Sequence, residues 1–139
     1  MRRYVLDASA VLRYLESAPG AARVEALLND ASDEACEIVM SAVNWGEVVY
    51  VLRRKLGRQD AAAAAKSVRS LPIGIVNAGE AEAEGAADLK DRYSIAYADC
   101  FAAALAIASD ATLLTGDFDF KRCQSELLIE FLPRLSATN

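Results

Sequence analysis

The run Tyr4-Val5-Leu6-Asp7-Ala8-Ser9 places an unbroken apolar segment directly before a carboxylate and two small residues. Apolar residues without polar alternation are typical of a strand that is buried on both faces, as in parallel sheets covered by helices. The same order returns later in the chain, where Leu113-Leu114-Thr115-Gly116-Asp117 again sets an acid just beyond an apolar run. These two segments predict buried strands that each present a carboxylate at their carboxyl end.

Working outward from these strands, further short apolar runs alternate with stretches of helical periodicity. This alternation indicates an α/β fold, in which a central parallel sheet of about five strands is flanked by helices on both faces. We expect a single domain over residues 1–139. The expected strands are 4–6, 38–40, 73–76, 112–115 and 128–131, and the expected helices are a short one closed by Pro19-Gly20, then 21–29, one ending at Gly57, 61–70, 78–90 and 97–108.

Local signals predict where several of these helices begin and end. Gly57 is expected to end the helix whose apolar stripe runs down to Leu56. Asp60 is positioned to cap the helix that follows. Asn77 and Glu80, three residues apart, predict a start of the capping-box kind for the next helix.

The composition excludes several kinds of catalysis. The chain of 139 residues contains no histidine, which removes serine and cysteine hydrolases that use histidine, histidine-based RNA cleavage and HExxH zinc chemistry. The chain has three widely spaced cysteines, Cys36, Cys100 and Cys123. Their odd number and their spacing argue against both a disulfide framework and a structural zinc site. The amino terminus has no signal-peptide apolar region, and the alanine-rich stretches 60–65 and 102–108 are too short to span a bilayer, so a cytoplasmic protein is expected.

Four carboxylates are expected at the same edge of the sheet. Asp7 and Asp117 follow strands, whereas Glu47 and Asp99 lie in the first turns of helices whose amino ends face that edge in a parallel sheet. Each one alone is also explained by helix capping, the helix dipole or a turn, but capping does not require that they meet.

A cluster of this kind has a direct electrostatic consequence. Two carboxylates about 4 Å apart repel by about 4 kcal/mol at an effective dielectric constant near 20, so the group either raises its pKa values or binds cations. Carboxylate oxygens without histidine or cysteine select Mg²⁺ or Mn²⁺ over zinc. Such ions can activate water for phosphodiester hydrolysis. The formal net charge of −5 by itself argues against a nucleic-acid partner, but bound cations would reverse the sign of the charge where a phosphate has to bind.

The sequence resembles the PIN-domain family in four blocks that occur in the family's order and span nearly the whole chain. The blocks are Val5-Leu6-Asp7-Ala8-Ser9, residues 41–48 (Ser-Ala-Val-Asn-Trp-Gly-Glu-Val), residues 96–106 (Ala-Tyr-Ala-Asp-Cys-Phe-Ala-Ala-Ala-Leu-Ala) and residues 113–120 (Leu-Leu-Thr-Gly-Asp-Phe-Asp-Phe). The compact length is similar to that of VapC-type toxins of toxin–antitoxin pairs.

The resemblance implies a PIN-like fold and a metal-dependent endoribonuclease. By motif match, Asp7, Glu47, Asp99 and Asp117 would be the catalytic and metal-binding acids, holding one or two Mg²⁺ or Mn²⁺ ions. Asp119 is a further candidate, as an outer ligand or a turn residue, and the hydroxyls of Ser9 and Thr115 would orient carboxylates unless they only cap helices. A homodimer, a VapB-type antitoxin that occupies the site and a structured RNA substrate are also implied.

One basic segment fits a nucleic-acid partner independently of the resemblance. The side chains of Arg53, Arg54, Lys55 and Arg58 could contact phosphates, or they could form an ordinary solvated helix face. Two other functions stay open: a catalytically silent PIN-like module that only binds protein, and a deoxyribonuclease with the same metals. A receiver-like phosphotransfer domain fits less well, because that chemistry usually needs a lysine at a late strand end, where this chain has Thr115-Gly116-Asp117.

Overall fold

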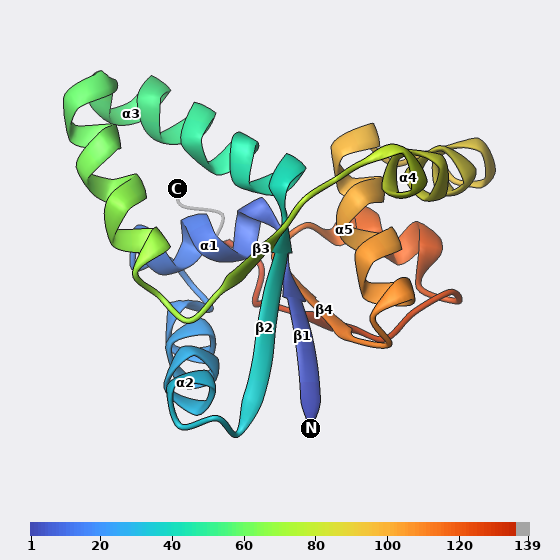
Figure 1. The fold of residues 1–139 in the computed structure, drawn as a ribbon, viewed down its shortest axis with the longest axis horizontal. Helices are drawn as coiled ribbons and strands as arrows, with labels where there is room; N and C mark the ends of the chain where they lie inside the picture. Colours follow the sequence, from blue (N-terminus) through green and yellow to red (C-terminus); the bar gives the residue numbers. More distant parts are fainter. Residues whose placement is uncertain (136–139) are drawn as a thin grey trace.

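The computed structural model describes residues 1–135, in which five strands form one sheet in the order β3-β2-β1-β4-β5 (Figure 1). Every neighbouring pair of strands is parallel, which confirms the predicted fold class. The elements in chain order are β1 Arg2–Leu6, α1 Ala8–Leu15, α2 Ala21–Ser32, β2 Cys36–Ser41, α3 Ala42–Arg69, β3 Gly74–Val76, α4 Glu80–Arg92, α5 Tyr97–Ala108, β4 Thr112–Thr115, the 3₁₀ helix η1 Phe118–Cys123 and β5 Ile129–Phe131.

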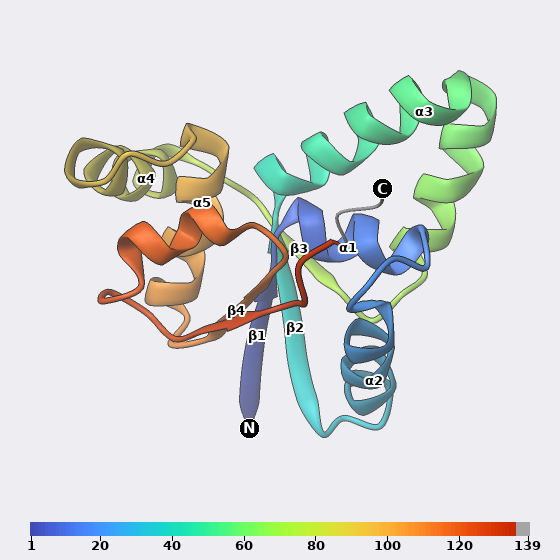
Figure 2. The ribbon, with the colours of Figure 1, turned by 180° about the vertical axis from the view of Figure 1, so that it is seen from behind.

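The helices cover both faces of this sheet, and each face has its own hydrophobic core (Figures 1 and 2). Successive residues of a strand point to opposite faces, so Tyr4 and Leu6 pack against α1, α2 and α3, whereas Val5 packs against α4 and α5. All three are buried, as the unbroken apolar run of β1 predicted. Among residues 1–135, no helix is both long and apolar enough to cross a membrane.

Several predicted helix boundaries differ from the structure, because the capping groups are not the ones expected. One predicted boundary is confirmed: at Gly57 the backbone leaves the helical conformation, with φ +80° and ψ 165°, so the first half of α3 ends there and a second helical half follows directly. Asp60 lies within the second half rather than capping it. Glu82, rather than Glu80, closes the start of α4, since its Oε1 accepts from the N–H of Gly79 at 2.7 Å.

At the amino end of α3, the cap is Ser41, whose hydroxyl accepts from the Val43 N–H at 3.2 Å. Asn44 and Glu47 lie inside the helix. Leu56 is 48% exposed, so the buried stripe of this helix stops at Leu52. Four strands also differ from their predicted bounds by one or two residues at an end, most of all β2, which begins at Cys36, whereas β4 has the predicted bounds.

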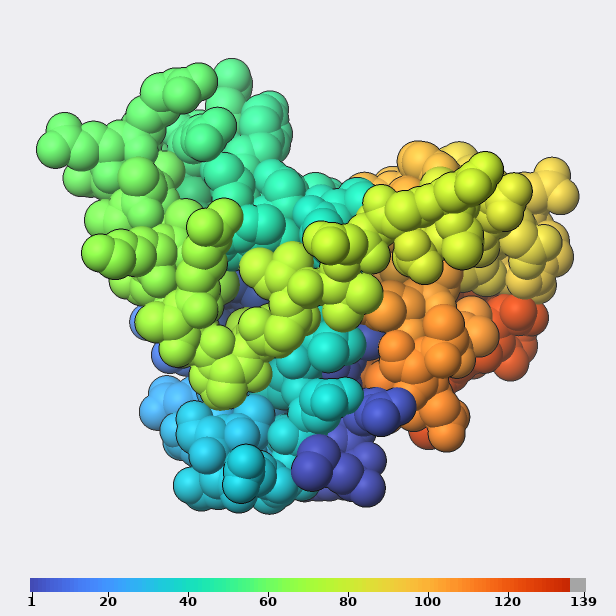
Figure 3. Space-filling model, in the orientation of Figure 1, coloured from blue at the N-terminus to red at the C-terminus, as the bar shows by residue number. Residues whose placement is uncertain are grey.

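The carboxyl ends of the strands meet the amino ends of α1, α3 and α5 at one edge of the sheet (Figure 1). In the space-filling view, the outline of the molecule is notched above this edge, between α3 and the pair α4 and α5 (Figure 3). Parallel strands with helices on both faces place ligand sites outside such an edge. The fold therefore directs attention to the side chains that lie there.

Candidate active site

Asp7 is the most deeply buried carboxylate at this edge, with 3% of its surface exposed. It caps α1: its Oδ1 accepts from the Ala10 N–H at 3.0 Å and from the Ser9 hydroxyl at 2.7 Å. Its Oδ2 accepts from the Thr115 hydroxyl at 2.6 Å. These hydrogen bonds stabilise the anion, but burial outweighs them and raises the pKa of Asp7 to about 6.

Ser9 and Thr115 connect Asp7 to the loop that carries Asp117. Each hydroxyl donates its proton to Asp7 and accepts from a backbone N–H, Ser9 from Gly116 at 2.9 Å and Thr115 from Asp117 at 2.9 Å. The two hydroxyl oxygens lie 3.2 Å apart. The two hydroxyls thus link a buried carboxylate to the backbone of the loop between β4 and η1 through hydrogen bonds. This link sets the position of Asp117 relative to Asp7.

Asp99, in the first turn of α5, is surrounded by the other three acids of the sequence motif. Burial raises its pKa to about 7, and repulsion from Asp117, Asp7 and Glu47 adds to this effect. Among these three acids, Asp117 contributes the largest repulsion. The fold therefore brings together the four carboxylates that were singled out in the sequence, from elements that are far apart along the chain.

Asn44 is a buried residue of this region that sequence reasoning did not select. Its side chain is fully buried, and its Nδ2 donates to the Glu47 Oε1 at 2.8 Å and to the Ala98 carbonyl at 3.1 Å. One amide group thus ties Glu47 of α3 to the residue that precedes Asp99 in α5. Its Oδ1 is, among residues 1–135, the one buried side-chain polar atom that lacks a hydrogen-bond partner.

Arg13 is a second residue that the sequence did not reveal. The whole residue is 8% exposed. Its guanidinium donates to the carbonyls of Pro19 at 2.8 Å, Pro133 at 2.7 Å and Gly116 at 3.2 Å. It packs so closely beneath the loop that a Cβ on Gly116 would lie 2.7 Å from its Nη2. The glycine between Thr115 and Asp117 is the signal in the sequence that something lies against this loop.

The remaining predicted site residues lie apart from this cluster. Asp119 is exposed; its N–H donates to Asp117 at 2.9 Å, but its carboxylate is 3.9 Å from Arg122 and is not among the charges that act on Asp7 or Asp99. The residues Arg53, Arg54, Lys55 and Arg58 are all exposed along the middle of α3, and Lys55 pairs with Glu16 of the α1 cap. None of their recorded contacts reaches the four carboxylates.

The donor set fits a hard divalent cation. Its ligands would be carboxylate oxygens alone, which Mg²⁺ and Mn²⁺ prefer, from Asp7, Glu47, Asp99 and Asp117. A bound cation would also reduce the repulsion among these four negative charges. As the side chains stand, no three acidic or cysteine groups among residues 1–135 are close enough to form a metal-binding group. The carboxylates are therefore neighbours, not a finished coordination shell.

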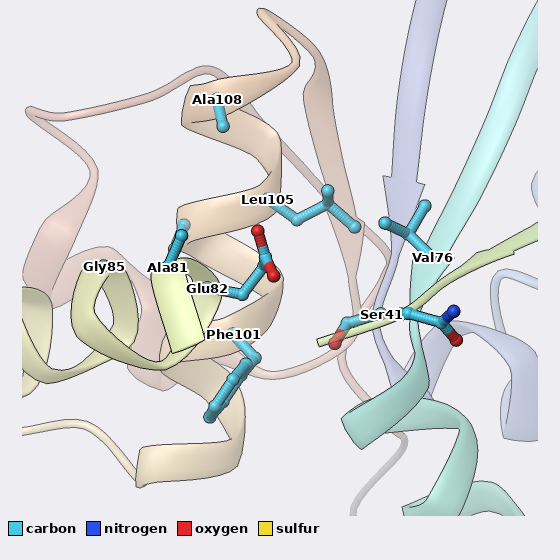
Figure 4. Close-up of a pocket in the computed structure, with 10 residues that line it drawn as sticks. Ser41, Val76, Ala81, Glu82, Gly85, Phe101, Leu105 and Ala108 are labelled. Atoms are coloured by element: carbon cyan, nitrogen blue, oxygen red, sulfur yellow. The ribbon is translucent and has the colours of Figure 1, made fainter. Parts of the chain in front are cut away.

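A separate apolar pocket of about 260 Å³ lies between α4, α5 and the ends of β2 and β3 (Figure 4). Leu105 and Phe101 of α5 and Val76 of β3 line it together with Glu82, and none of the four clustered acids does. Its lining suits apolar side chains rather than phosphate groups. This pocket is thus distinct from the acidic edge.

Comparison with known proteins places this arrangement in a family. A sequence model of the PIN domain matches residues 4–125. No curated protein sequence is a significant match to the chain. Solved structures with the same fold include the VapBC2 complex of Rickettsia felis bound to a fragment of its promoter DNA, with a TM-score of 0.77, 18% identity and coverage of 94% of this chain and 99% of that one.

Two further structures show the same likeness. The Mycobacterium tuberculosis toxin VapC20, which cleaves the sarcin–ricin loop, aligns with a TM-score of 0.64 and 17% identity over 94% of this chain and 99% of that one. FitAcB of Neisseria gonorrhoeae aligns with a TM-score of 0.68 and 19% identity over 91% and 95%. At such identities these structures establish a shared fold.

Proposed function

Because this chain belongs to the PIN-domain family, we propose that it is a metal-dependent endoribonuclease, the toxin of a type II toxin–antitoxin pair. The observation that carries the proposal is the placement of Asp7, Glu47, Asp99 and Asp117 at one edge of the sheet, where repulsion from the other three acids adds to the burial that raises the pKa of Asp99. A structural cap does not need three other acids beside it. A site that binds one or two divalent cations does.

In this proposal the four carboxylates hold Mg²⁺ or Mn²⁺, which would supply Lewis-acid stabilisation of the phosphodiester and a water molecule activated for attack. The chain's own residues position the ligands. Ser9 and Thr115 hold Asp7 and carry the Asp117 loop towards it, and Asn44 holds Glu47. Because the chain has no histidine, no imidazole is available to activate the 2′-hydroxyl of RNA.

The choice of RNA over DNA rests on the family and on the named activity of VapC20, since both nucleic acids offer the same phosphodiester. The proposed protein partner is a VapB-type antitoxin, in keeping with the VapBC complexes that share the fold. We also propose a homodimer and a cytoplasmic location. The pocket of Figure 4 and a second apolar hollow of about 200 Å³ between α1 and the two halves of α3, which includes Leu56, offer surfaces for such partners.

The test is incubation of the purified protein with total cellular RNA and Mg²⁺ or Mn²⁺, beside EDTA and two variants. Asp99→Asn removes one clustered acid, and Glu25→Gln removes an exposed acid of α2 as a matched control. We expect discrete RNA fragments that require both the metal and Asp99, with Glu25→Gln fully active. If no metal promotes cleavage and no metal shifts the melting temperature, the result would instead support the silent binding module. Cleavage of DNA but not of RNA would support the deoxyribonuclease.

A further inference from the structure

An aromatic pair that takes no part in the proposed metal site lies beside the acidic cluster. The rings of Phe118 and Phe131 stack with centroids 4.9 Å apart and an angle of 11° between their planes. Both side chains are half-buried, so their edges reach solvent. Phe118 follows Asp117 directly, as the first residue of η1.

Two cations lie on this pair. The Arg134 guanidinium carbon is 3.9 Å from the centroid of the Phe118 ring, and Lys121 Nζ is 5.3 Å from the Phe118 ring and 5.9 Å from the Phe131 ring. Lys121 and Arg134 are both exposed, and within residues 1–135 neither forms an ion pair with a carboxylate. Their charges therefore remain available at this surface.

The backbone holds these side chains at the carboxyl edge of the sheet. The Leu132 N–H donates to the Thr115 carbonyl at 2.8 Å, which ties the end of β5 to the end of β4, and Arg13 binds the carbonyl of Pro133 at 2.7 Å. Figure 2 shows the segment after β5 running past the end of β4 towards α1. The aromatic pair and its cations thus lie next to the loop that carries Asp117.

Packing alone does not account for this arrangement. Phe120 and Leu132, neighbours of the aromatic residues in sequence, are 0% and 1% exposed and already anchor η1 and the β5 end in the two cores. Phe131 packs in part against the core on the α4 and α5 side of the sheet, whereas Phe118 belongs to neither core and stacks on Phe131 at the surface. Aromatic rings with adjacent cations are the combination that binds single-stranded nucleic acids, since the rings stack with bases and the cations meet phosphates.

We propose that the group Phe118, Phe131, Lys121 and Arg134 is an RNA subsite, in which one unpaired base takes the place of the Arg134 guanidinium on the face of Phe118 opposite Phe131, while Arg134 and Lys121 contact the adjoining phosphates. This inference rests on the proposed ribonuclease function and extends it by assigning residues that bind the nucleotide beside the cleaved bond. The subsite also supplies positive charge next to carboxylates that would otherwise repel the RNA backbone.

The test measures RNA binding separately from cleavage. Fluorescence anisotropy with a labelled oligoadenosine RNA, in the Asp99→Asn background, compares Phe118→Leu, Phe118→Tyr and Arg134→Gln. An abasic ribose-phosphate chain of the same length is the matched probe. Arg3→Gln, on the opposite edge of the sheet at the start of β1, is the matched charge control. Melting temperatures verify that each variant is folded.

We expect Phe118→Leu to weaken oligoadenosine binding roughly tenfold, and Phe118→Tyr to retain it, because loss of one stacked base has an effect of this size. Binding of the abasic chain should not change in Phe118→Leu. Arg134→Gln should weaken binding of both probes and reduce the slope of log affinity against log salt by about one, as for a lost phosphate contact, whereas Arg3→Gln should not.

A second readout uses cleavage by otherwise native protein, where Phe118→Leu should raise KM with little change in kcat. If RNA binds and is cleaved normally, yet Phe118→Leu binds oligoadenosine as tightly as its parent, the subsite is refuted and the ribonuclease proposal stands. If the parent protein binds no RNA at all, both proposals are refuted together.

Discussion

Replacing Asp99 with asparagine is expected to stabilise the protein in EDTA at pH 8. Asp99 has its pKa raised from 3.8 to about 7 by burial and by the three neighbouring acids, so the folded state keeps it ionised at pH 8 only at a cost in free energy. That difference corresponds to roughly 4 kcal/mol, at about 1.4 kcal/mol for each tenfold change in proton affinity. Partial exposure to solvent screens the interaction, and we therefore expect a measured gain of about 2 kcal/mol.

The gain should depend on pH in a defined direction. A carboxyl group whose pKa is raised on folding binds its proton more tightly in the folded state, so its ionisation makes the protein lose stability as pH rises from about 4 to about 7. Asparagine removes the contribution of Asp99 to that loss. The stability difference between Asp99→Asn and wild type should thus be small near pH 4, grow up to about pH 7 and stay constant above it.

The assay is urea unfolding in EDTA across this pH range, with Glu25→Gln as the control for loss of one negative charge. At pH 8 the expected gain corresponds to a rise in melting temperature of roughly 6 °C for a domain of this size. An Asp99→Asn protein that is less stable than wild type at pH 8, or a stability difference that does not vary with pH, would refute the argument that the four carboxylates repel one another.

Three other substitutions test two supports of the site and the break within α3. Asn44→Ala should lower the free energy of unfolding by about 1–3 kcal/mol, because Glu47 and a backbone carbonyl lose their donor. It should also reduce kcat by roughly tenfold or more, with a smaller effect on KM. Unchanged steady-state kinetics would show that Glu47 needs no such support. Arg13→Met should cost about 2–4 kcal/mol in urea unfolding, since three carbonyls lose one buried donor group; a loss under about 0.5 kcal/mol, ordinary for a surface change, would contradict this assignment. Gly57→Ala should cost about 1–3 kcal/mol, because φ +80° with ψ 165° is a backbone conformation that essentially only glycine adopts, whereas Gly46→Ala in the same helix, where a Cβ meets nothing within 4 Å, should be neutral or stabilising.

The convergence of the four acids could be predicted because it follows from topology. A parallel sheet brings the carboxyl ends of its strands and the amino ends of its helices to one edge, so Asp7, Asp117, Glu47 and Asp99 needed only a correct assignment of strands and helices. The apolar runs of β1 and β4 and the alternation with helices were sufficient for that assignment.

The supports of the site were not predictable in the same way, since they join residues that no local pattern relates. Arg13 binds the carbonyl of Gly116, 103 positions away, and Asn44 binds that of Ala98, 54 positions away. Either side chain also has an ordinary place on a helix. The capping predictions at Asp60 and Glu80 were wrong for the opposite reason: several residues near each helix start can act as caps, and tertiary packing decides which of them does.

The proposed cleavage chemistry is tested most directly by the ends of the RNA fragments. If water bound at the carboxylate site attacks the phosphodiester, mass spectrometry of the products should find a terminal phosphate monoester on one fragment, a free hydroxyl on the other, and no cyclic phosphate. Formation of these fragments should require Mg²⁺ or Mn²⁺ and be lost in Asp99→Asn. Fragments that end in 2′,3′-cyclic phosphate, or that form in EDTA or with Asp99→Asn, would show that the RNA 2′-hydroxyl or another site performs the reaction.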